Sequence, residues 1–337
     1  MPARQNHKLE KLEKIYSELH EEGPVTLFVA PPIRFAYKRS DYLFLLYKDL
    51  LASPVYKIDS VSTIGHLKFV LWAVLGKKSI LHYHWLEYTG FFAGFNYFFK
   101  LSCIWVYKKL GGKIVWSIHN KLPLDCSHEW IHFKTRKWLA QKADRLLIEC
   151  ESVLAEISTY FNVHINKFRV WPHPAYPPQL MPRAAAVEAI NHRYNVTIKV
   201  QDRLFLMFGH ISPYKQIDKV CEIFLKQPIQ KKLLIVGPVK NGQMKYYKKI
   251  RKLSQQKENI VLIPQFIKEE CVPEFMNATD YVLFNYREIL SSGGVSLARS
   301  YDKPIILPKT GCLRELDDEN LRFFGTQEEL KTLIENL

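Results

Sequence analysis

The chain has 337 residues, a length that suits two α/β domains better than one hydrophobic core. Hydrophobic residues make up 47% of it, which excludes a disordered body. The formal net charge of +15 indicates an anionic partner. Because no zinc-finger or RNA-binding signature is present, nucleic acid is disfavoured, which leaves a phosphorylated substrate or an anionic membrane surface.

The first predicted element is a charged helix over residues 8–22, in which opposite charges lie four residues apart. This stretch does not have the pattern of a secretory signal peptide. The N-terminus therefore predicts a cytoplasmic protein.

Apolar runs of strand length recur along the chain, separated by segments of helix length. Continuous apolar strands that alternate with helices predict parallel sheets covered on both faces. A proline-rich and then polar stretch over residues 172–203 has the composition of a linker between two halves of about five strands each. The predicted strands span residues 25–30, 79–83, 113–118, 145–149, 168–171, 204–208, 232–236, 259–263, 281–284 and 304–307.

Residues 88–106 are apolar and aromatic enough to imitate a membrane span. Lys100 and two glycines interrupt the segment, whereas about 20 apolar residues are needed to cross a bilayer. We therefore expect a helix between two strands, whose aromatic face either packs in the core or touches a membrane. Lys108, Lys109 and Lys113, directly after it, suit an anionic headgroup layer.

Histidines stand at the ends of two predicted strands in the first half. His82 and His84 end one strand, and His119 and Asn120 end the next. Since ligands of parallel sheets bind outside the carboxyl ends of the strands, an imidazole here can act as a general base or bond a sugar. The His-x-His spacing puts both rings on one face, but a third metal ligand at suitable spacing is missing. Buried structural histidines are the alternative.

The strand exits of the second half indicate a phosphate site. Gly209 and His210 end one strand, and Lys215 can reach a phosphate that the glycine allows to approach the backbone. Gly237 and Pro238 form another tight exit after the next strand.

The loop Ser291-Ser292-Gly293-Gly294 precedes a predicted helix that begins near Val295. The free N–H groups and the positive dipole end of such a helix suit a diphosphate. A plain helix cap with a flexible turn is the alternative.

Taken in order and with their spacing, these motifs resemble bacterial glycosyltransferases of the GT-B architecture over most of the chain. The fold that the resemblance implies is α/β, with two Rossmann-like domains whose parallel sheets face a central cleft. Domain 1–180 would bind the acceptor, and domain 181–337 would bind the nucleotide-sugar. The resemblance rests on residues 30–34 (APPIR), 82–85 (HYHW), 116–120 (WSIHN), 172–176 (PHPAY), 208–218 (FGHISPYKQID), 286–293 (YREILSSG) and 303–306 (KPII).

The resemblance also implies roles for individual residues. Lys215 would contact the donor diphosphate, and the 291–294 loop would hold it through backbone N–H groups. His119, His84 and Glu288 are the catalytic candidates, and Glu288 would also lie near the donor sugar or ribose. The donor-binding candidates are Gly209, His210, Lys215, Gly237, Tyr286, Glu288, Ser291, Ser292, Gly293 and Gly294. The acceptor-binding candidates are Arg34, Trp85, Glu87 and Asn120, with Glu129 as a further carboxylate.

The sequence departs from the family pattern at the donor site. His210 stands where many relatives have arginine, and Ser296 or Leu297 stands where they have a second glutamate. No convincing Asp-x-Asp pair follows a strand. We therefore expect metal-independent transfer without a cofactor, in which Lys215 and a helix N-terminus stabilise the leaving diphosphate.

The expected function is transfer of a sugar from GDP-mannose or a UDP-sugar to a lipid-linked saccharide acceptor in the biosynthesis of a surface polysaccharide such as a capsule or exopolysaccharide. The basic charge and the aromatic segment predict peripheral association with the inner face of the plasma membrane. A GT-B sugar-nucleotide epimerase and a non-catalytic GT-B partner subunit are the alternatives. A nicotinamide-dependent dehydrogenase is disfavoured, because no Gly-x-Gly-x-x-Gly follows an early strand.

Overall fold

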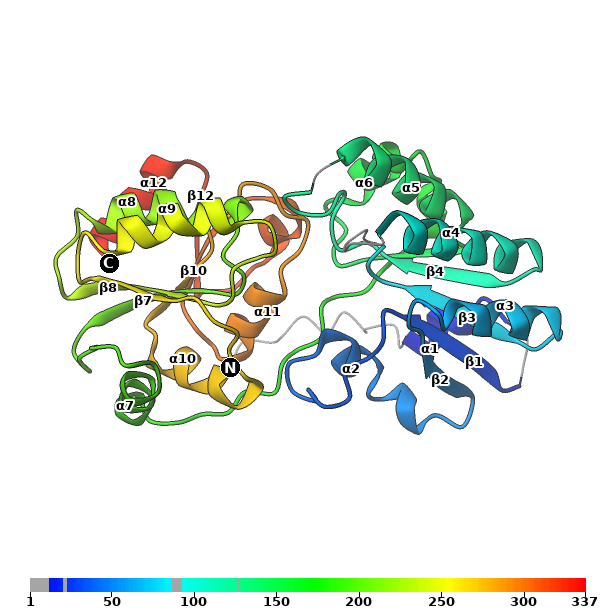
Figure 1. Ribbon diagram of the computed structural model, residues 1–337, viewed down its shortest axis with the longest axis horizontal. Coiled ribbons are helices and arrows are strands. Elements are labelled where there is room, and N and C mark those ends of the chain that lie inside the picture. The colour runs from blue at the N-terminus through cyan, green and yellow to red at the C-terminus, as the bar shows by residue number, and fades with distance from the viewer. Residues whose placement is uncertain (1–11, 21–22, 87–92, 127) are drawn as a thin grey trace. The chain divides into compact units, whose positions relative to one another are not determined.

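Parallel strands form two separate six-stranded sheets in the computed structural model, which describes residues 12–20, 23–86, 93–126 and 128–337 (Figure 1). The chain divides between Pro174 and Ala175 into a first and a second unit, each with one sheet. This division lies slightly before the predicted boundary between residues 180 and 181. The predicted α/β class with two parallel sheets is confirmed.

The sheet of the first unit has the order β2-β1-β3-β4-β5-β6, and every neighbouring pair is parallel. Alternate strand residues such as Leu27, Ile80 and Val115 face one buried core with α1 and α2. The strands are β1 (Val25–Ala30), β2 (Tyr56–Ser60), β3 (Ser79–Tyr83), β4 (Lys113–Ser117), β5 (Arg145–Ile148) and β6 (Phe168–Val170). The helices are α1 (Leu12–Ser17), α2 (Tyr42–Tyr47), α3 (His66–Val74), α4 (Ala93–Lys109), α5 (Glu129–Lys142) and α6 (Leu154–Phe161).

The sheet of the second unit has the order β12-β11-β10-β7-β8-β9, again with parallel neighbours. Phe205, Met207 and Ile235 belong to its core, which α8, α9 and α12 cover. The strands are β7 (Arg203–Phe208), β8 (Lys231–Val236), β9 (Ile260–Ile263), β10 (Tyr281–Leu283), β11 (Ile305–Pro308) and β12 (Leu321–Phe324). The helices are α7 (Arg183–Tyr194), α8 (Ile217–Phe224), α9 (Met244–Ser254), α10 (Val272–Ala278), α11 (Gly293–Ser300) and α12 (Gln327–Asn336).

Two elements differ from the sequence-based prediction. The stretch 172–203 is not a linker throughout, because residues 183–194 form α7, which packs against α10 of the second unit. The described part of the N-terminal segment is the short helix α1, which buries Leu12, Ile15 and Tyr16 rather than standing in solvent as a charged helix.

The apolar segment 88–106 contributes to helix α4, as predicted for a helix between two strands; residues 87–92 are outside the described part of the chain. Its large side chains are divided between the core and the surface. Tyr97 and Ile104 are buried, whereas Phe95 and Phe98 are 76% and 71% exposed. Within the described residues, no helix combines the length and the apolar character that a membrane span requires.

Candidate functional site

Many of the predicted site residues, among them His84 and Lys215, follow strands that flank the reversal points of the two sheets. The strand order reverses between β1 and β3 in the first unit, and between β7 and β10 in the second. At such a point the two crossover connections leave in opposite directions, which opens a crevice above the carboxyl ends of the strands. The segments that follow these strands are therefore the places where a ligand is expected in each unit.

His82 and His84 at the end of β3 are buried and hydrogen-bonded. The hydroxyl of Tyr16 lies 2.6 Å from Nδ1 of His82, whose Nε2 lies 2.9 Å from the Ser117 hydroxyl. The Tyr47 hydroxyl contacts Nδ1 of His82 and, at 2.8 Å, Nε2 of His84. Burial lowers the pKa of His82 to about 3 and the pKa of His84 well below its ordinary value. Both rings are therefore neutral at pH 7.

His119, after β4, is less enclosed, with 12% of its side chain exposed. Its Nδ1 lies 3.6 Å from Oε1 of Glu149, and its Nε2 lies 3.4 Å from Nδ1 of His84. The ring of Trp85 stacks on it with a centroid distance of 4.7 Å and an interplanar angle of 18°. A carboxylate beside an imidazole fixes the orientation of the ring. This arrangement can accept a proton from a hydroxyl or hydrogen-bond a sugar.

Tyr42 and His173 complete this group of side chains. Tyr42 begins α2, and its ring centroid lies 4.9 Å from that of His173 and 5.1 Å from that of His119. His173 follows β6, and its Nδ1 lies 2.8 Å from the Pro174 carbonyl oxygen. Burial lowers the pKa of His173, against the effect of the nearby Glu149 carboxylate. We call the group the imidazole cluster: Tyr42, His84, Trp85, His119, Glu149 and His173.

The remaining predicted residues of the first unit have other surroundings. Arg34 is exposed in the loop after β1, and Glu129 is exposed at the start of α5. Asn120 follows β4, and its carbonyl oxygen accepts a hydrogen bond of 2.8 Å from Arg136. Glu87 lies outside the described residues.

The sequence-based list of site residues lacks Glu149, Tyr42 and His173. Glu149 directly follows β5, so the rule that selects His119, a polar residue just after an apolar strand, selects Glu149 as well. Tyr42 has no such signal, because a loop separates it from β1. It stands in the first turn of α2, after Asp41, which caps the helix by accepting a 2.8 Å hydrogen bond from the amide of Phe44.

In the second unit, Lys215 is buried against a glycine turn. Its amine donates a 2.8 Å hydrogen bond to the carbonyl oxygen of Phe208, and burial lowers its pKa to about 7. A Cβ on Gly209 would lie 2.8 Å from this amine, and a Cβ on Gly237 would lie 2.5 Å from the carbonyl oxygen of Gly209. Both glycines have positive φ angles, 101° and 140°. Side chains at either position would displace the turn that holds the amine.

The segments after β7 and β10 contact each other. The rings of Tyr214 and Tyr286 are stacked 5.8 Å apart, and the carbonyl oxygen of Tyr214 accepts a 2.8 Å hydrogen bond from the amide of Arg287. The Tyr286 hydroxyl lies 2.7 Å from the hydroxyl of Ser292. Two motifs that are some 70 residues apart in the sequence, 208–218 and 286–293, thus meet at one edge of the sheet.

Ser292 caps helix α11. Its Oγ accepts a hydrogen bond of 3.3 Å from the amide of Val295, the position near which the helix was predicted to begin. The amides of Gly293 and Gly294 form the first turn, where a helix supplies no acceptor of its own. Together with the dipole, these donors make the start of α11 suitable for an anion.

His210 and Glu288, two other predicted donor residues, are exposed. Partial burial, followed by the charges of Lys215 and Lys240, lowers the pKa of His210. Across the residues that the structure describes, no group of three or more histidine, cysteine, aspartate or glutamate side chains is arranged to hold a metal ion.

Solved structures with a similar backbone identify the fold. HepE from Anabaena, in complex with UDP and glucose, matches with a TM-score of 0.67 and 14% identity over 92% of this chain and 89% of its own. The catalytic domain of starch synthase IV from Arabidopsis thaliana, bound to ADP and acarbose, matches with a TM-score of 0.65 and 11% identity over 94% and 91%. WaaG, a glycosyltransferase involved in lipopolysaccharide biosynthesis, matches with a TM-score of 0.55 and 14% identity over 92% and 90%.

These matches cover nearly the whole chain and both units, so the chain has the GT-B fold. At 11–14% sequence identity, the similarity establishes the fold alone. No family model matches the sequence, and no curated protein does.

Proposed function

We propose that this GT-B chain is a glycosyltransferase that binds a nucleotide-sugar in its second unit and transfers the sugar to a saccharide acceptor bound by its first unit. The observation that carries the proposal is the buried Lys215 amine, held against the Gly209 turn at the reversal point of the sheet. A buried cation beside closely approachable backbone suits a diphosphate. The HepE structures that hold UDP or UDP-glucose favour a UDP-sugar as the first donor to test, with GDP-mannose as the second.

The donor site works by electrostatic stabilisation. As the bond to the sugar breaks, negative charge grows on the leaving diphosphate. Lys215 and the amides of Gly293 and Gly294 offset this charge without a metal ion, and Gly237 keeps the turn open for close approach. Tyr286 and Ser292 support the start of α11, Ser291 lines it, and Glu288 contacts the donor sugar or ribose from the exposed loop.

The imidazole cluster of the first unit binds the acceptor. The neutral rings of His84 and His173 and the aromatic faces of Tyr42 and Trp85 match the hydroxyls and apolar faces of a sugar. His119 is the base of our choice if the transfer inverts the anomeric centre, because its Nδ1 lies beside the Glu149 carboxylate and its Nε2 makes only a long contact of 3.4 Å with His84. His84 supports His119 instead, since Tyr47 occupies its Nε2 and burial lowers its pKa.

The acceptor we propose is lipid-linked, in the biosynthesis of a surface polysaccharide, and the protein is peripheral at the inner face of the plasma membrane. The net charge of +15 and the exposed Phe95 and Phe98 of α4 support a membrane location. The similarity in fold to WaaG, which is involved in lipopolysaccharide biosynthesis, supports a role of this kind.

Calorimetric titration with UDP and GDP tests the donor site. We expect Lys215→Ala to weaken nucleotide binding about 10- to 100-fold, because it removes a charge-assisted hydrogen bond to phosphate. Lys226→Ala, an exposed lysine of the same unit, is the matched control and should leave the affinity unchanged. Equal affinities of the wild type and Lys215→Ala would contradict the proposed donor site.

A screen of nucleotide-sugars against lipid-diphosphate saccharides tests the reaction. A transferase gives an elongated acceptor together with free nucleoside diphosphate. The epimerase alternative would be supported by release of the nucleotide without an elongated acceptor, or by an altered sugar on the nucleotide. Tight binding of the nucleotide-sugar without any turnover would support the non-catalytic subunit.

A further inference from the structure

Helices α3 and α4 of the first unit lie side by side (Figure 1). Both expose large apolar side chains. On each helix the exposed positions are spaced by three, four or seven residues, which places them on one face. Their exposed fractions range from 50% for Trp105 to 76% for Phe95. Contiguous apolar surface of this kind marks an interaction site. We call it the α3–α4 face: Leu67, Leu71, Val74, Phe95, Phe98 and Trp105.

The charge around this face is predominantly positive, although Asp59 is paired at 3.1 Å with Lys68 of α3. Between Asp59 and Asp125 the sequence contains eight lysines and one acidic residue, Glu87. Neither α3 nor α4 contains an aspartate or a glutamate. A second copy of the chain would therefore bring like charges together at this face, whereas a negatively charged surface would be attracted to it.

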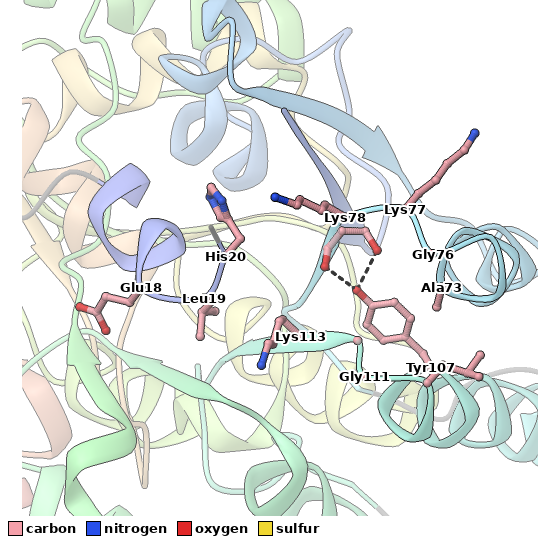
Figure 2. A pocket seen from close by; sticks show the side chains of 13 residues that line it. Glu18, Leu19, His20, Ala73, Gly76, Lys77, Lys78, Tyr107, Gly111 and Lys113 are labelled. Atoms are coloured by element: carbon pink, nitrogen blue, oxygen red, sulfur yellow. Dashed lines mark hydrogen bonds between the residues drawn. The ribbon is translucent and has the colours of Figure 1, made fainter. Parts of the chain in front are cut away.

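A basic pocket of about 610 Å³ lies at the C-terminal ends of these two helices, where the turns into β3 and β4 meet (Figure 2). Lys77, Lys78 and Lys113 line it, and the amine of Lys77 stands 4.3 Å over the ring of Trp72. Glu18 also lines the pocket, but its carboxylate is bound at 2.7 Å by both Arg145 and Arg169. The pocket is therefore positive as a whole.

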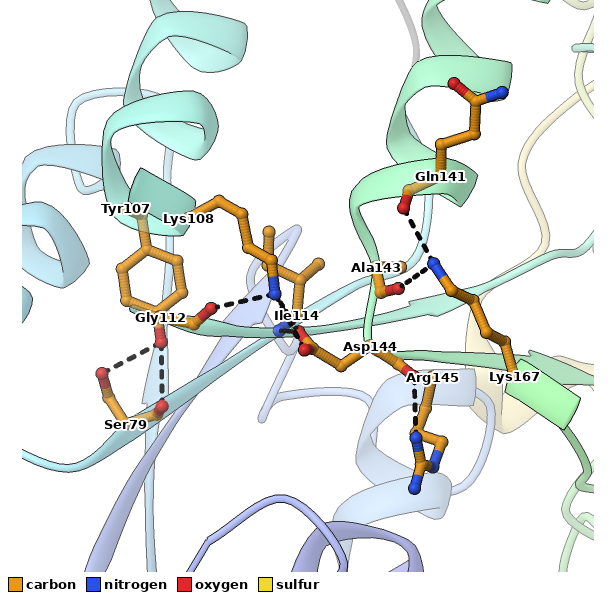
Figure 3. A network of polar contacts seen from close by, with 10 residues as sticks. All are labelled: Ser79, Tyr107, Lys108, Gly112, Ile114, Gln141, Ala143, Asp144, Arg145 and Lys167. Carbon is orange, nitrogen blue, oxygen red and sulfur yellow. Dashed lines mark hydrogen bonds and ion pairs between the residues drawn. The ribbon is translucent and has the colours of Figure 1, made fainter. Parts of the chain in front are cut away.

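Lys108 does not take part in this positive surface, contrary to the expectation from the sequence (Figure 3). Its amine lies 2.8 and 2.6 Å from the two carboxylate oxygens of Asp144, which also accepts a 2.8 Å hydrogen bond from the amide of Ile114. This ion pair fixes the end of α4 to the start of β4. It leaves Lys109 and Lys113, which flank this contact, as the exposed lysines of the turn.

We propose that the α3–α4 face and the basic pocket together dock on a membrane of anionic phospholipid. The aromatic side chains of Phe95, Phe98 and Trp105 enter the interface between headgroups and acyl chains, where aromatic residues are favoured. Lys77, Lys78 and Lys113 bind headgroup phosphates at the C-terminal ends of the two helices. The inference gives a surface to the proposed membrane location, and it does not depend on sugar transfer.

Co-sedimentation of the full chain with vesicles tests the charge component. Binding is expected to vesicles of phosphatidylcholine with phosphatidylglycerol at low salt, and to fall at high salt and with phosphatidylcholine alone. Removing a lysine near the surface weakens binding about fivefold, so Lys77→Ala, Lys78→Ala and Lys113→Ala combined should weaken it about 100-fold. The control combines Lys245→Ala, Lys248→Ala and Lys252→Ala, three exposed lysines on α9 of the second unit. An equal loss in both triple variants would overturn the pocket as the docking site.

A second pair of variants tests the apolar component. Phe95→Ser with Phe98→Ser should weaken vesicle binding at least about tenfold, since two exposed aromatic rings no longer enter the interface. Leu180→Ser with Phe266→Ser, which are 79% and 61% exposed in the second unit, is the control and should bind like the wild type. Unchanged vesicle binding of the phenylalanine variant, or a change of its oligomeric state in solution instead, would overturn the proposal.

UDP binding and thermal melting of the same variants separate this inference from the proposed function. All four variants should melt like the wild type and keep its UDP affinity, because every substituted residue is exposed and outside the donor site. A chain that binds vesicles through this face but no nucleotide would refute the transferase alone. A chain that binds UDP but not anionic vesicles would refute the docking surface alone.

Discussion

The two units have the same type of sheet but opposite chemistry at its carboxyl edge. In the first unit the strands end in imidazole and aromatic rings, whose buried members have lowered pKa values and are neutral at pH 7. In the second unit they end in glycine turns, a buried amine and the start of a helix. The comparison suggests a division of roles through the residues just after the strands rather than through the fold: in our proposal, the first sheet suits a neutral saccharide and the second a diphosphate.

The largest expected difference between the units is their response to acid. Burial lowers the pKa of His82 to about 3, that of His66 to about 4, and that of His84 well below its ordinary value, so in the unfolded chain all three bind protons near pH 6.5 but in the folded chain they do not. The free energy of unfolding of the first unit should therefore fall, as pH drops below 6.5, by up to about 4 kcal/mol per pH unit for the three groups.

Tryptophan fluorescence during urea unfolding measures this response selectively, because all seven tryptophans precede Ala175. A free energy of unfolding of the first unit that stays constant between pH 7 and pH 5 would contradict the proposed difference. An equal fall in the free energy of unfolding of the second unit, followed by circular dichroism, would contradict it as well.

Gly237→Ala should damage the second unit alone, by about 3 kcal/mol. The new Cβ would lie 2.5 Å from the carbonyl oxygen of Gly209, at a φ of 140° that side chains disfavour. Circular dichroism during urea unfolding gives the loss, while the tryptophan-detected transition should stay in place. Gly94→Ala in α4, with no atom within 4 Å of its Cβ, is the control and should be neutral or slightly stabilising. A Gly237→Ala protein as stable as the wild type would show that the turn is not held rigidly.

Glu149→Gln tests whether the imidazole cluster of the first unit acts in sugar transfer but not in UDP binding. If the carboxylate of Glu149 orients the ring of His119, the neutral amide should lower kcat for transfer about 100-fold and leave the affinity for UDP unchanged. Glu156→Gln, an exposed carboxylate on α6, is the matched control for kcat. A weaker UDP affinity in Glu149→Gln with an unchanged kcat would contradict the assignment of this cluster to the acceptor.

The smallest expected effect is the pH dependence of UDP binding. Burial lowers the pKa of Lys215 to about 7, so the free amine loses its proton above that pH, and the bound diphosphate favours the charged form. UDP affinity should therefore fall about tenfold per pH unit as pH rises above 7. Lys215→Arg, which stays charged, should show a flat profile in the same titrations. An identical slope in both proteins would show that another group controls it.

The sequence predicts ten of the strands because continuous apolar runs are unambiguous when both faces of a strand are buried. It misses β2 and β12, the outermost strand at one edge of each sheet, because Lys57 and Arg322 are exposed there and interrupt the apolar pattern. Helix α7 is missed since proline and polar residues around it imitate a linker.

The candidate sites are predictable to the extent that their residues directly follow strands. Lys215, Ser292 and His119 are found in this way, and their contacts with Phe208, Tyr286 and Glu149 then come from the structure. The neutral state of His84 is not predictable, because it depends on Tyr47 from a separate helix and on burial that no local pattern encodes.

Each unit is also continuous in the sequence: the six strands of one sheet precede Ala175, and the six strands of the other follow it. Domains fold as units during synthesis, beginning with the N-terminal one. The first sheet therefore has all its strands before the ribosome has made the first strand of the second, and it is able to fold while translation continues. For this chain, the order of synthesis is therefore also the expected order in which the two units fold.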